Sequence, residues 1–479
     1  MDLTELIYFA TFASLVVLLV TLCLYRGLFF CLFQRFSLLG SASIYHVYLQ
    51  YLVYPRFNPR ILGLAKLSPL RTVIFLLYVV GTIVANVAGL HTLQQRATRA
   101  AHLSLINLCL LFMSGGREFG AYLLGISRET YSMVHRIAGF MAGVQAAVHV
   151  ALACQKTWFT TADDTQYYGL LAMYELFLVT HLVCAFLALY LLWKHIQLAV
   201  EMARRFVLVC IVTFSVTGVL QALRVLFRNV VFGRRALRVS ITPFTEDIVR
   251  AELRLPRPWT VRAGERVTLG VPAVGLFYFF QAHPFSITWW EENQDGEADR
   301  VFLLFRARTG FTRKALMCLE PDREYWAWID GPFGPSAVHQ CGATRDLGDY
   351  GHIFMVTTGI GIAAQLPYMK ELVQRRRLAG IRTQRICLVW QLDRTGDYEC
   401  ARDWLQHLVK LDNGYMLKVL VYDPLSKDQE VRKFGYHDLI TVHSGEPNWG
   451  EVLSQEKQDR AGKILVSAKQ RLVFKKGRI

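Results

Sequence analysis

Six apolar runs in the first half of the chain constrain its fold more than any other feature. Each run has the length of a helix that crosses a hydrocarbon core about 30 Å thick. Five of them contain no Asp, Glu, Lys or Arg, and the sixth contains only Arg136; the runs are 6–25, 72–95, 100–116, 131–155, 176–193 and 206–223. We therefore predict six membrane-spanning helices. The first is expected to be a retained anchor, because it lacks the basic leader and cleavage site of a signal peptide.

Two of these runs carry histidines at the same spacing. The stretch "MVHRIAGFMAGVQAAVHV" holds His135 and His149, and "HLVCAFLALYLLWKH" holds His181 and His195. Fourteen residues fall about 40° short of four helical turns and rise about 21 Å, so each pair lies on one helix face, near the two sides of the membrane. A lone histidine in such a run is more often a packing residue. Two matched pairs instead suit two haems, each held between one imidazole from each helix, whereas zinc needs clustered ligands.

The formal net charge of +16 does not indicate a nucleic-acid partner. The basic residues gather at the ends of the predicted spans, as the positive-inside rule requires of cytosolic loops. Two groups show this: Arg35, Arg56, Arg60, Lys66 and Arg71, and then Arg224, Arg228, Arg234, Arg235 and Arg238. We therefore expect the second half of the chain to lie in the cytosol. The ten cysteines are scattered without a CxxC pair, which indicates neither a disulfide framework nor a zinc site.

Residues 236–272 read as short alternating strands separated by Pro and Gly, which is typical of a small antiparallel barrel. The motif "HPFSI" begins at His283, and "GFT", Gly310 to Thr312, follows the basic stretch "FRAR". These motifs are open to a plain interpretation as strand ends. Beside a pyrophosphate, however, Gly310 permits close backbone approach and Arg306 or Arg308 supplies charge.

From residue 352 the pattern changes to strand, turn and helix. "HIFMVTTGIGIAAQLPYMKELVQRRR" reads as a buried strand, a turn at Gly359 and Gly361, and an amphipathic helix whose N-terminus suits a phosphate. Ala364 stands where a full G-x-G-x-x-G would have its third glycine, so the motif alone is weak. Two further strands, "RICLVWQLD" and "LKVLVY", alternate with the helix "ARDWLQHLV". This alternation predicts a parallel α/β sheet.

Taken together, these motifs resemble the fungal ferric reductases and, more distantly, the NADPH oxidases. Those proteins join a membrane cytochrome with two b haems to a cytosolic module of the ferredoxin-reductase type. The matching stretches occur in the family's order and are "VHRIAGF…VH", "YELFLVTH…WKH", "HPFSI", "GFT", "DGPFG", "TTGIGIA", "VW" and "GEPNWGEVL". The equal spacing of the two histidine pairs favours the reductase branch.

The resemblance implies FAD, two b-type haems and NADPH as cofactors, and it implies a role for each motif residue. The haem ligands would be His135, His149, His181 and His195. The flavin would contact His283, Pro284, Phe285, Ser286, Arg306, Gly310 and Thr312. NADPH would lie over Thr358, Gly359, Ile360 and Gly361, with Trp390 in the nucleotide cleft. Basic residues at 375–377 and Arg394 are expected to reach the 2′-phosphate, which makes NADPH preferred over NADH.

The predicted fold class is a membrane all-α haem-binding bundle followed by a ferredoxin-reductase-like module. That module would consist of an antiparallel β-barrel FAD domain and an α/β nucleotide-binding domain. The expected domains are an anchor and basic loop at 1–71, a haem domain at 72–233, an FAD barrel at 234–340 and an NADPH domain at 341–479. The chain is expected to be a multi-pass protein of the plasma membrane.

Two departures from the family pattern qualify this prediction. The family has a further membrane helix between its haem helices, but here only 31 residues separate His149 from His181. Six spans would make the two haem helices antiparallel, pairing His135 with His195 and His149 with His181, and would leave the flavin module outside. The usual Cys-Gly-Pro motif is also absent after the last strand, "KILVSA". On these grounds we expect this chain to be a poor reductase, which a span of about 20 residues inserted between 150 and 175 would rescue.

The predicted reaction is transmembrane electron transfer from cytosolic NADPH through FAD and two haems to an extracytosolic metal ion, Fe(III) or Cu(II). Two alternatives stay open. One is an NADPH oxidase that produces superoxide, and the other is an inactive haem-binding relative.

Overall fold

The structure is a computed structural model of the 479-residue chain. It describes residues 68–90, 92–112, 116–124, 126–153, 174–196, 201–275, 283–334, 347–377, 381–412, 416–426, 431–434, 439–458 and 464–469, with isolated positions before residue 68. The chain divides into two compact units, Met1–Gln221 and Ala222–Ile479, and each is described by itself. Most of the predicted first span, 6–25, lies outside the described residues.

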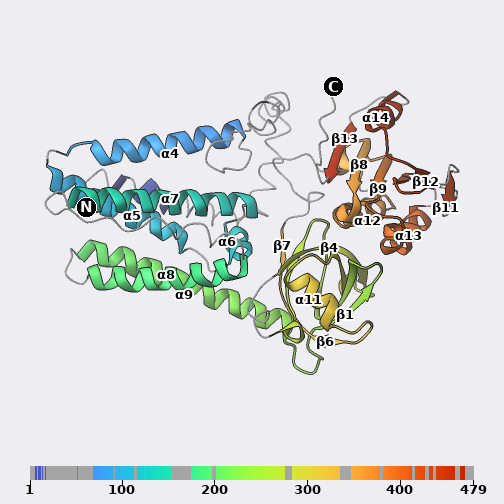
Figure 1. Ribbon diagram of the computed structural model, residues 1–479, viewed down its shortest axis with the longest axis horizontal. Helices are drawn as coiled ribbons and strands as arrows, with labels where there is room; N and C mark the ends of the chain where they lie inside the picture. Colours follow the sequence, from blue (N-terminus) through green and yellow to red (C-terminus); the bar gives the residue numbers. More distant parts are fainter. Residues whose placement is uncertain are drawn as a thin grey trace. The chain divides into compact units, whose positions relative to one another are not determined.

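The first unit is helical (Figure 1). Its described helices are α4 Pro69–Val87, α5 Leu93–Leu111, α6 Arg117–Leu123, α7 Arg128–Ala153, α8 Tyr174–Ile196 and α9 Glu201–Asn229, the last of which continues into the second unit. The predicted run 72–95 is not one helix. It ends at Val87, because Gly89 turns the chain at φ +68°. Thr92 then begins α5 with a capping box to Gln95, which satisfies backbone N–H groups at the helix start.

Two helices in the described part of the chain, α4 and α9, are long and apolar enough to cross a membrane. Six were expected, so the prediction is met only in part over these residues. Much of the apolar surface of α4 and α9 is exposed rather than packed, including Leu77 and Val80 on α4 and Leu208 and Val219 on α9. Continuous exposed apolar faces of this kind are costly in water and favourable in lipid.

The contacts between helices establish their directions. Helix α5 runs antiparallel to α7 and parallel to α9, and α8 packs antiparallel against α9. Helices α7 and α8 are therefore parallel. The pairs that fix these directions are His149–Ala97 and Ser104–Ala142 between α7 and α5, Cys109–Phe206 and Phe112–Phe214 between α5 and α9, and Phe186–Phe214 between α8 and α9. The expectation of antiparallel haem helices is wrong.

The second unit begins with a curled antiparallel sheet (Figure 1). Its strand order is β6-β1-β2-β5-β4-β3-β7. The elements are β1 Arg238–Pro243, β2 Ile248–Trp259, β3 Arg266–Gly270, β4 His283–Glu292, β5 Ala298–Arg306, α11 Phe311–Cys318, β6 Tyr325–Trp326 and β7 Trp328–Phe333. Strands β6 and β7 are separated by one residue, so one short segment pairs with β1 at one end and with β3 at the other. The predicted flavin barrel accordingly has antiparallel strands throughout its described part.

The end of α9 packs where the segment of β6 and β7 passes from β1 to β3. We call this contact between Asn229 and Ile329 the seam. The Asn229 side chain donates to the Ile329 carbonyl (2.6 Å) and accepts from the Ile329 N–H (2.8 Å). These two bonds take the place of strand pairing on the open side of β7. Arg224 adds a bond to the Pro332 carbonyl (2.8 Å), and its guanidinium lies 4.5 Å from the Phe333 ring centre.

A second sheet follows, with the order β11-β12-β10-β9-β8-β13. Its elements are β8 His352–Thr358, α12 Ile362–Arg377, β9 Arg385–Gln391, α13 Arg402–Asp412, β10 Leu417–Asp423, β11 Arg432–Phe434, β12 Ile440–Ser444, α14 Trp449–Gln458 and β13 Ile464–Lys469. All neighbouring strands are parallel except β11 with β12. The predicted parallel α/β sheet is confirmed.

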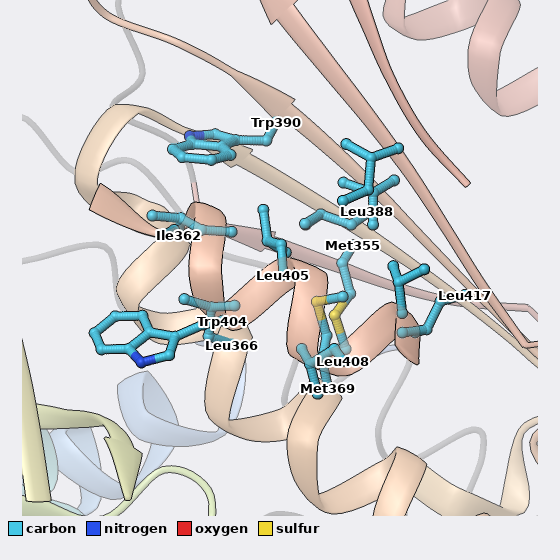
Figure 2. Packing of buried hydrophobic residues seen from close by; sticks show 14 of the residues in the cluster. Met355, Ile362, Leu366, Met369, Leu388, Trp390, Trp404, Leu405, Leu408 and Leu417 are labelled. Atoms are coloured by element: carbon cyan, nitrogen blue, oxygen red, sulfur yellow. The ribbon is translucent and has the colours of Figure 1, made fainter. Parts of the chain in front are cut away.

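The main core of this domain lies between the sheet and helices α12 and α13 (Figure 2). Met355 and Leu388 from the strands meet Leu366, Met369 and Leu405 from the two helices, and all five are buried. The same cluster extends into the barrel through Trp289 and Phe302. A smaller cluster on the other face of the sheet packs against α14.

Helix α12 also binds the barrel directly. The buried Lys370 ammonium donates to the Trp290 carbonyl and lies 4.7 Å and 4.2 Å from the ring centres of Trp289 and Trp290. Burial lowers the pKa of Lys370 to about 8. The adjacent Glu371 accepts the Ala263 N–H at 2.8 Å. The barrel and the nucleotide-type domain are therefore joined by both apolar and polar contacts.

We expect Asn229→Ala to lower the free energy of unfolding of the second unit by about 2–3 kcal/mol, because the Ile329 N–H and C=O lose their partners in a buried seam. Thermal unfolding of the purified chain, followed by tryptophan fluorescence, measures this. Asn293→Ala is the control, because Asn293 also bonds two backbone N–H groups, but in an exposed turn where water replaces it. Equal losses for the two variants would refute the seam role.

Candidate functional site

The structure brings one member of each histidine pair together. His135 and His181 each stand seven residues after the first residue of their helices, and their ring centres are 6.2 Å apart with planes at 73°. An imidazole nitrogen binds a metal ion at about 2 Å, so two imidazoles on opposite sides of one iron have ring centres roughly 6 Å apart. The observed separation matches that span. His149 and His195 lie four turns farther along the same two parallel helices.

His149 is oriented by a backbone bond. Its Nδ1 lies 2.8 Å from the carbonyl oxygen of Ala97. When Nδ1–H donates to this carbonyl, Nε2 keeps the lone pair that an iron ion takes, which is the usual arrangement around metal-bound histidines. His195 is exposed on the last turn of α8. His135 and His181 are the two of the four predicted haem ligands whose rings the structure brings close together.

The predicted flavin motif forms the start of β4, and its side chains alternate in direction. His283 and Phe285 point inward, where the His283 ring stacks on Phe311 at 4.2 Å and Phe285 contacts Phe305 at 5.0 Å. Pro284 and Ser286 are exposed on the outer face. Burial lowers the pKa of His283 to about 4, so its imidazole is neutral at pH 7. The outward residues are therefore the ones that can reach a flavin directly, and the inward pair supports them.

The "GFT" motif lies beside this strand, because Phe311 is the residue on which His283 stacks. Gly310 has φ +65° and directly precedes α11, a conformation that favours glycine. The Thr312 hydroxyl accepts the Arg308 N–H at 3.1 Å and so closes the turn. The N-terminus of a helix directs backbone N–H groups outward, which suits a pyrophosphate. The structure thus joins the two sequence motifs that we assigned to the flavin.

The Arg306 guanidinium is already paired with carboxylates, so it is not positioned to bind a flavin phosphate. It contacts Asp393 at 2.7 Å, Asp397 at 2.8 Å and Asp247 at 3.4 Å. Burial lowers the pKa of Arg306, but the three carboxylates more than reverse this and raise it overall. The expected flavin role is therefore not supported by the geometry. Arg306 instead ties the last residue of β5 to the nucleotide-type domain.

A pocket of about 240 Å³ lies between the barrel and the second sheet. It is lined on the barrel side by Arg266 and Ser286, and on the other side by Gln365, Tyr368 and Ser467. Gln365 and Ser467 are joined by a 3.4 Å bond between α12 and β13. Ser286 is the lining residue that was also predicted as a flavin contact. The pocket thus lies between the strand that carries the predicted flavin motif and the helix that follows the glycine turn.

The sequence offered a weak signal for the other lining residues. Gln365 and Tyr368 stand three apart on α12 and so share a helix face. Ser467 lies in the last apolar strand, which the structure confirms as β13 and pairs in parallel with β8.

The turn after β8 has the geometry of a phosphate site. Thr358 ends the strand, and Gly359 to Gly361 form a single 3₁₀ turn before α12. Gly359 has φ +48°, and a β-carbon there would stand 2.0 Å from Oδ2 of Asp393. A side chain here would have to displace the Asp393 carboxylate, so this position favours glycine. The following helix N-terminus lies at the carboxyl edge of the sheet, where α/β domains bind nucleotides.

Two expected nucleotide contacts are wrong. Trp390 does not line the cleft, because it is fully buried in the core and its indole N–H donates to the Gly359 carbonyl at 2.9 Å. The Trp390 side chain therefore supports the backbone of the glycine turn from inside the core. The basic residues at 375–377 end α12, and they lie about 20 Å along the helix from its N-terminus, at the opposite edge of the sheet. Of the expected basic contacts, Arg394 alone remains on the nucleotide edge, and it contacts Asp247 at 3.5 Å.

A flavin-type barrel beside a parallel sheet with a glycine turn defines a ferredoxin-reductase-like module. Family comparison agrees, since residues 231–337 match the FAD-binding domain model and residues 350–433 match the model of the ferric reductase NAD binding domain. Over these two ranges the chain is similar to the FAD-binding and NAD-binding domains of ferric reductases.

Curated relatives extend this similarity to membrane proteins. The "Ferric/cupric reductase transmembrane component 2" of Saccharomyces cerevisiae is 22% identical over 313 residues, covering 59% of this chain and 41% of that protein. The "Ferric reductase transmembrane component 3" of the same yeast is 23% identical over 303 residues, covering 58% and 40%. The chain thus spans about two fifths of the length of these curated relatives.

Among solved structures, a flavohemoglobin from Malassezia yamatoensis covers 80% of this chain and 92% of its own at 15% identity, with a TM-score of 0.37. A score this low supports no conclusion about the bundle or its ligands.

We expect Gly359→Ala to lower the free energy of unfolding by at least about 1 kcal/mol more than Gly396→Ala. Both positions have positive φ, but only at Gly359 does the added methyl meet a neighbour, Asp393; a methyl on Gly396 meets no heavy atom within 4 Å. Chemical denaturation of both variants measures the difference. Equal destabilisation would show that the Asp393 contact at this turn is not rigid.

Between about pH 6.5 and pH 4, His283 should make the protein less stable as the pH falls. Its pKa is about 4 when folded, so only the unfolded chain binds its proton in that window. The contribution of His283 to the free energy of unfolding is fully present above about pH 6.5, and its loss is complete near pH 4. Unfolding measured from pH 7.5 to 4 should show a shallower decline for His283→Gln. The control Phe285→Leu weakens the same packing without removing a titrating group, so it should keep the wild-type slope.

Proposed function

We propose that the chain is a transmembrane reductase that passes electrons from a cytosolic nicotinamide nucleotide to an extracytosolic metal ion. FAD would be the flavin, two b haems would be held in the helical unit, and Fe(III) or Cu(II) would be the acceptor. In such a chain FAD supplies the step from two-electron to one-electron transfer, and the haems supply one-electron carriage. The observation that carries the proposal is the 6.2 Å pair of His135 and His181 in a chain that also has the two reductase domains.

The protein's own part in this reaction is to hold and orient. Pro284 and Ser286 would contact the flavin ring, Gly310 and Thr312 its phosphates, and the inward His283 would stay neutral behind them. The glycine turn from Gly359 would receive the nucleotide phosphates. The pocket lined by Tyr368 and Gln365 would be the region where hydride passes.

In the helical unit, His135 and His181 would bind one haem, and His149 and His195 the other. The second haem would lie about 21 Å farther along the helices, near the other membrane face. The parallel directions of α7 and α8 support this pairing. They also remove one of the two grounds on which a poor reductase was expected, namely the antiparallel arrangement of the haem helices.

The membrane location is supported by the exposed apolar faces of α4 and α9. Arg224, Arg228 and Arg234 follow the last apolar run, which favours a cytosolic second unit under the positive-inside rule. The plasma membrane is the expected location. NADPH is the donor that the family resemblance implies, and Arg394 is the one basic residue from the sequence prediction that lies on the correct edge of the sheet.

Single substitutions of His135, His149, His181 or His195 by Ala should each remove about one of the two haems, because each haem loses one of its two protein ligands. The Soret absorbance per protein in purified, membrane-inserted protein measures this. His102→Ala is the control, since His102 lies in the same bundle on α5 but outside both pairs. A quadruple variant that inserts and keeps its full Soret band would contradict the ligand assignment.

The reaction itself is tested with wild-type protein in lipid vesicles. NADPH with a ferric chelate and a ferrous trap should give Fe(II) without a matching yield of superoxide. Superoxide as the main product would replace the reductase with an oxidase. Two haems with no nucleotide-dependent reduction of either acceptor would identify the inactive haem-binding relative.

A further inference from the structure

An acidic side chain stands on the glycine turn that we assign to the nucleotide phosphates. Asp393 follows β9, the second strand of the α/β unit, and lies at the carboxyl edge of the sheet. Its carboxylate touches Gly359, where a β-carbon would come within 2.0 Å of Oδ2 and 2.7 Å of Oδ1. The carboxylate side chain is about one third exposed, so a ligand on the turn can reach it.

The carboxylate of Asp393 is held in place from the barrel. Arg306 contacts it at 2.7 Å, and the same guanidinium also contacts Asp397 and Asp247. One positive charge shared among three carboxylates cannot neutralise Asp393 fully. Arg394 is the next residue along the chain, but it forms its ion pair with Asp247. The edge that receives the nucleotide therefore keeps a fixed negative charge.

We propose that Asp393 is a specificity-determining residue of the nucleotide site, which accepts ribose hydroxyls and disfavours a 2′-phosphate; this rests on the proposed nucleotide function. A carboxylate after the second strand of an α/β nucleotide unit accepts hydrogen bonds from the 2′-hydroxyl of the adenosine ribose. A 2′-phosphate at the same place brings up to two negative charges against the carboxylate. Asp393 thus lowers the affinity for NADPH relative to NADH.

Most of the positive charges that could offset this effect lie elsewhere or are already paired. The basic residues at 375–377 are at the far end of α12, and Arg306 is shared among carboxylates. Arg394 is half-exposed and is the cation of this set that remains on the nucleotide edge. The choice between the two nucleotides is therefore set by the balance between Asp393 and Arg394, with Arg306 fixing where the carboxylate stands.

The test uses the purified full-length chain and two adenosine probes that differ mainly at the 2′ position, 5′-AMP and 2′,5′-ADP, with affinities measured by titration calorimetry. Asp393→Asn should raise the affinity for 2′,5′-ADP at least about tenfold, as expected when a like charge at close range is removed. It should change 5′-AMP affinity by less than about threefold. Asp393→Ser, also neutral, should shift the ratio of the two affinities in the same direction. Titrations with NADP⁺ and NAD⁺ should follow the same order.

Glu399→Gln is the matched control, because it removes an exposed carboxylate nearby that pairs with Arg402. It should leave the ratio unchanged. Two results overturn the inference. If 2′,5′-ADP and 5′-AMP bind wild-type protein but their ratio is the same in both Asp393 variants, the specificity role is wrong while the nucleotide site stands. If neither probe and neither dinucleotide binds the wild-type protein, the proposed nucleotide function fails and the inference fails with it.

Discussion

The packing of α12 across β4 is the contact on which the arrangement of the second unit depends. Lys370, which is buried against Trp289 and Trp290, and Glu371, which accepts the Ala263 N–H, hold this helix to the barrel. The N-terminus of α12 follows the glycine turn, and β4 begins with the flavin motif. One interface therefore sets the separation between the two proposed cofactor sites. Without it, the pocket between Ser286 and Gln365 would not exist.

Much of this architecture was predictable from the sequence because it rests on local patterns. Alternating strands with Pro and Gly breaks predicted the barrel, and strand–turn–helix alternation predicted the parallel sheet. The family resemblance implied one flavin site for the motifs around His283 and Gly310, and the stacking of His283 on Phe311 brings these motifs together. The equal spacing of the histidine pairs likewise predicted which helices would face one another.

The errors share a physical cause, which is that a sequence does not show where a side chain's partner comes from. From the sequence, Arg306 was predicted to bind a phosphate. In the structure it pairs with Asp393 and Asp397, which come from the nucleotide-type domain. Trp390 was predicted to line the nucleotide cleft. Its strand, β9, is instead a central strand of the sheet, and both faces of that strand are buried. The directions of α7 and α8 depended on contacts with α5 and α9, which no spacing within either helix reveals.

The seam bonded by Asn229 has a consequence for how this chain can vary in length. Residues 222–229 form the last two turns of α9, and the amide at the end of them must meet the Ile329 backbone face to face. One inserted or deleted residue in this stretch would rotate the amide by about 100° and move it about 1.5 Å along the axis. Substitutions on the outer side of these turns leave the bonds intact. The segment is thus fixed in its number of residues more strictly than in its composition.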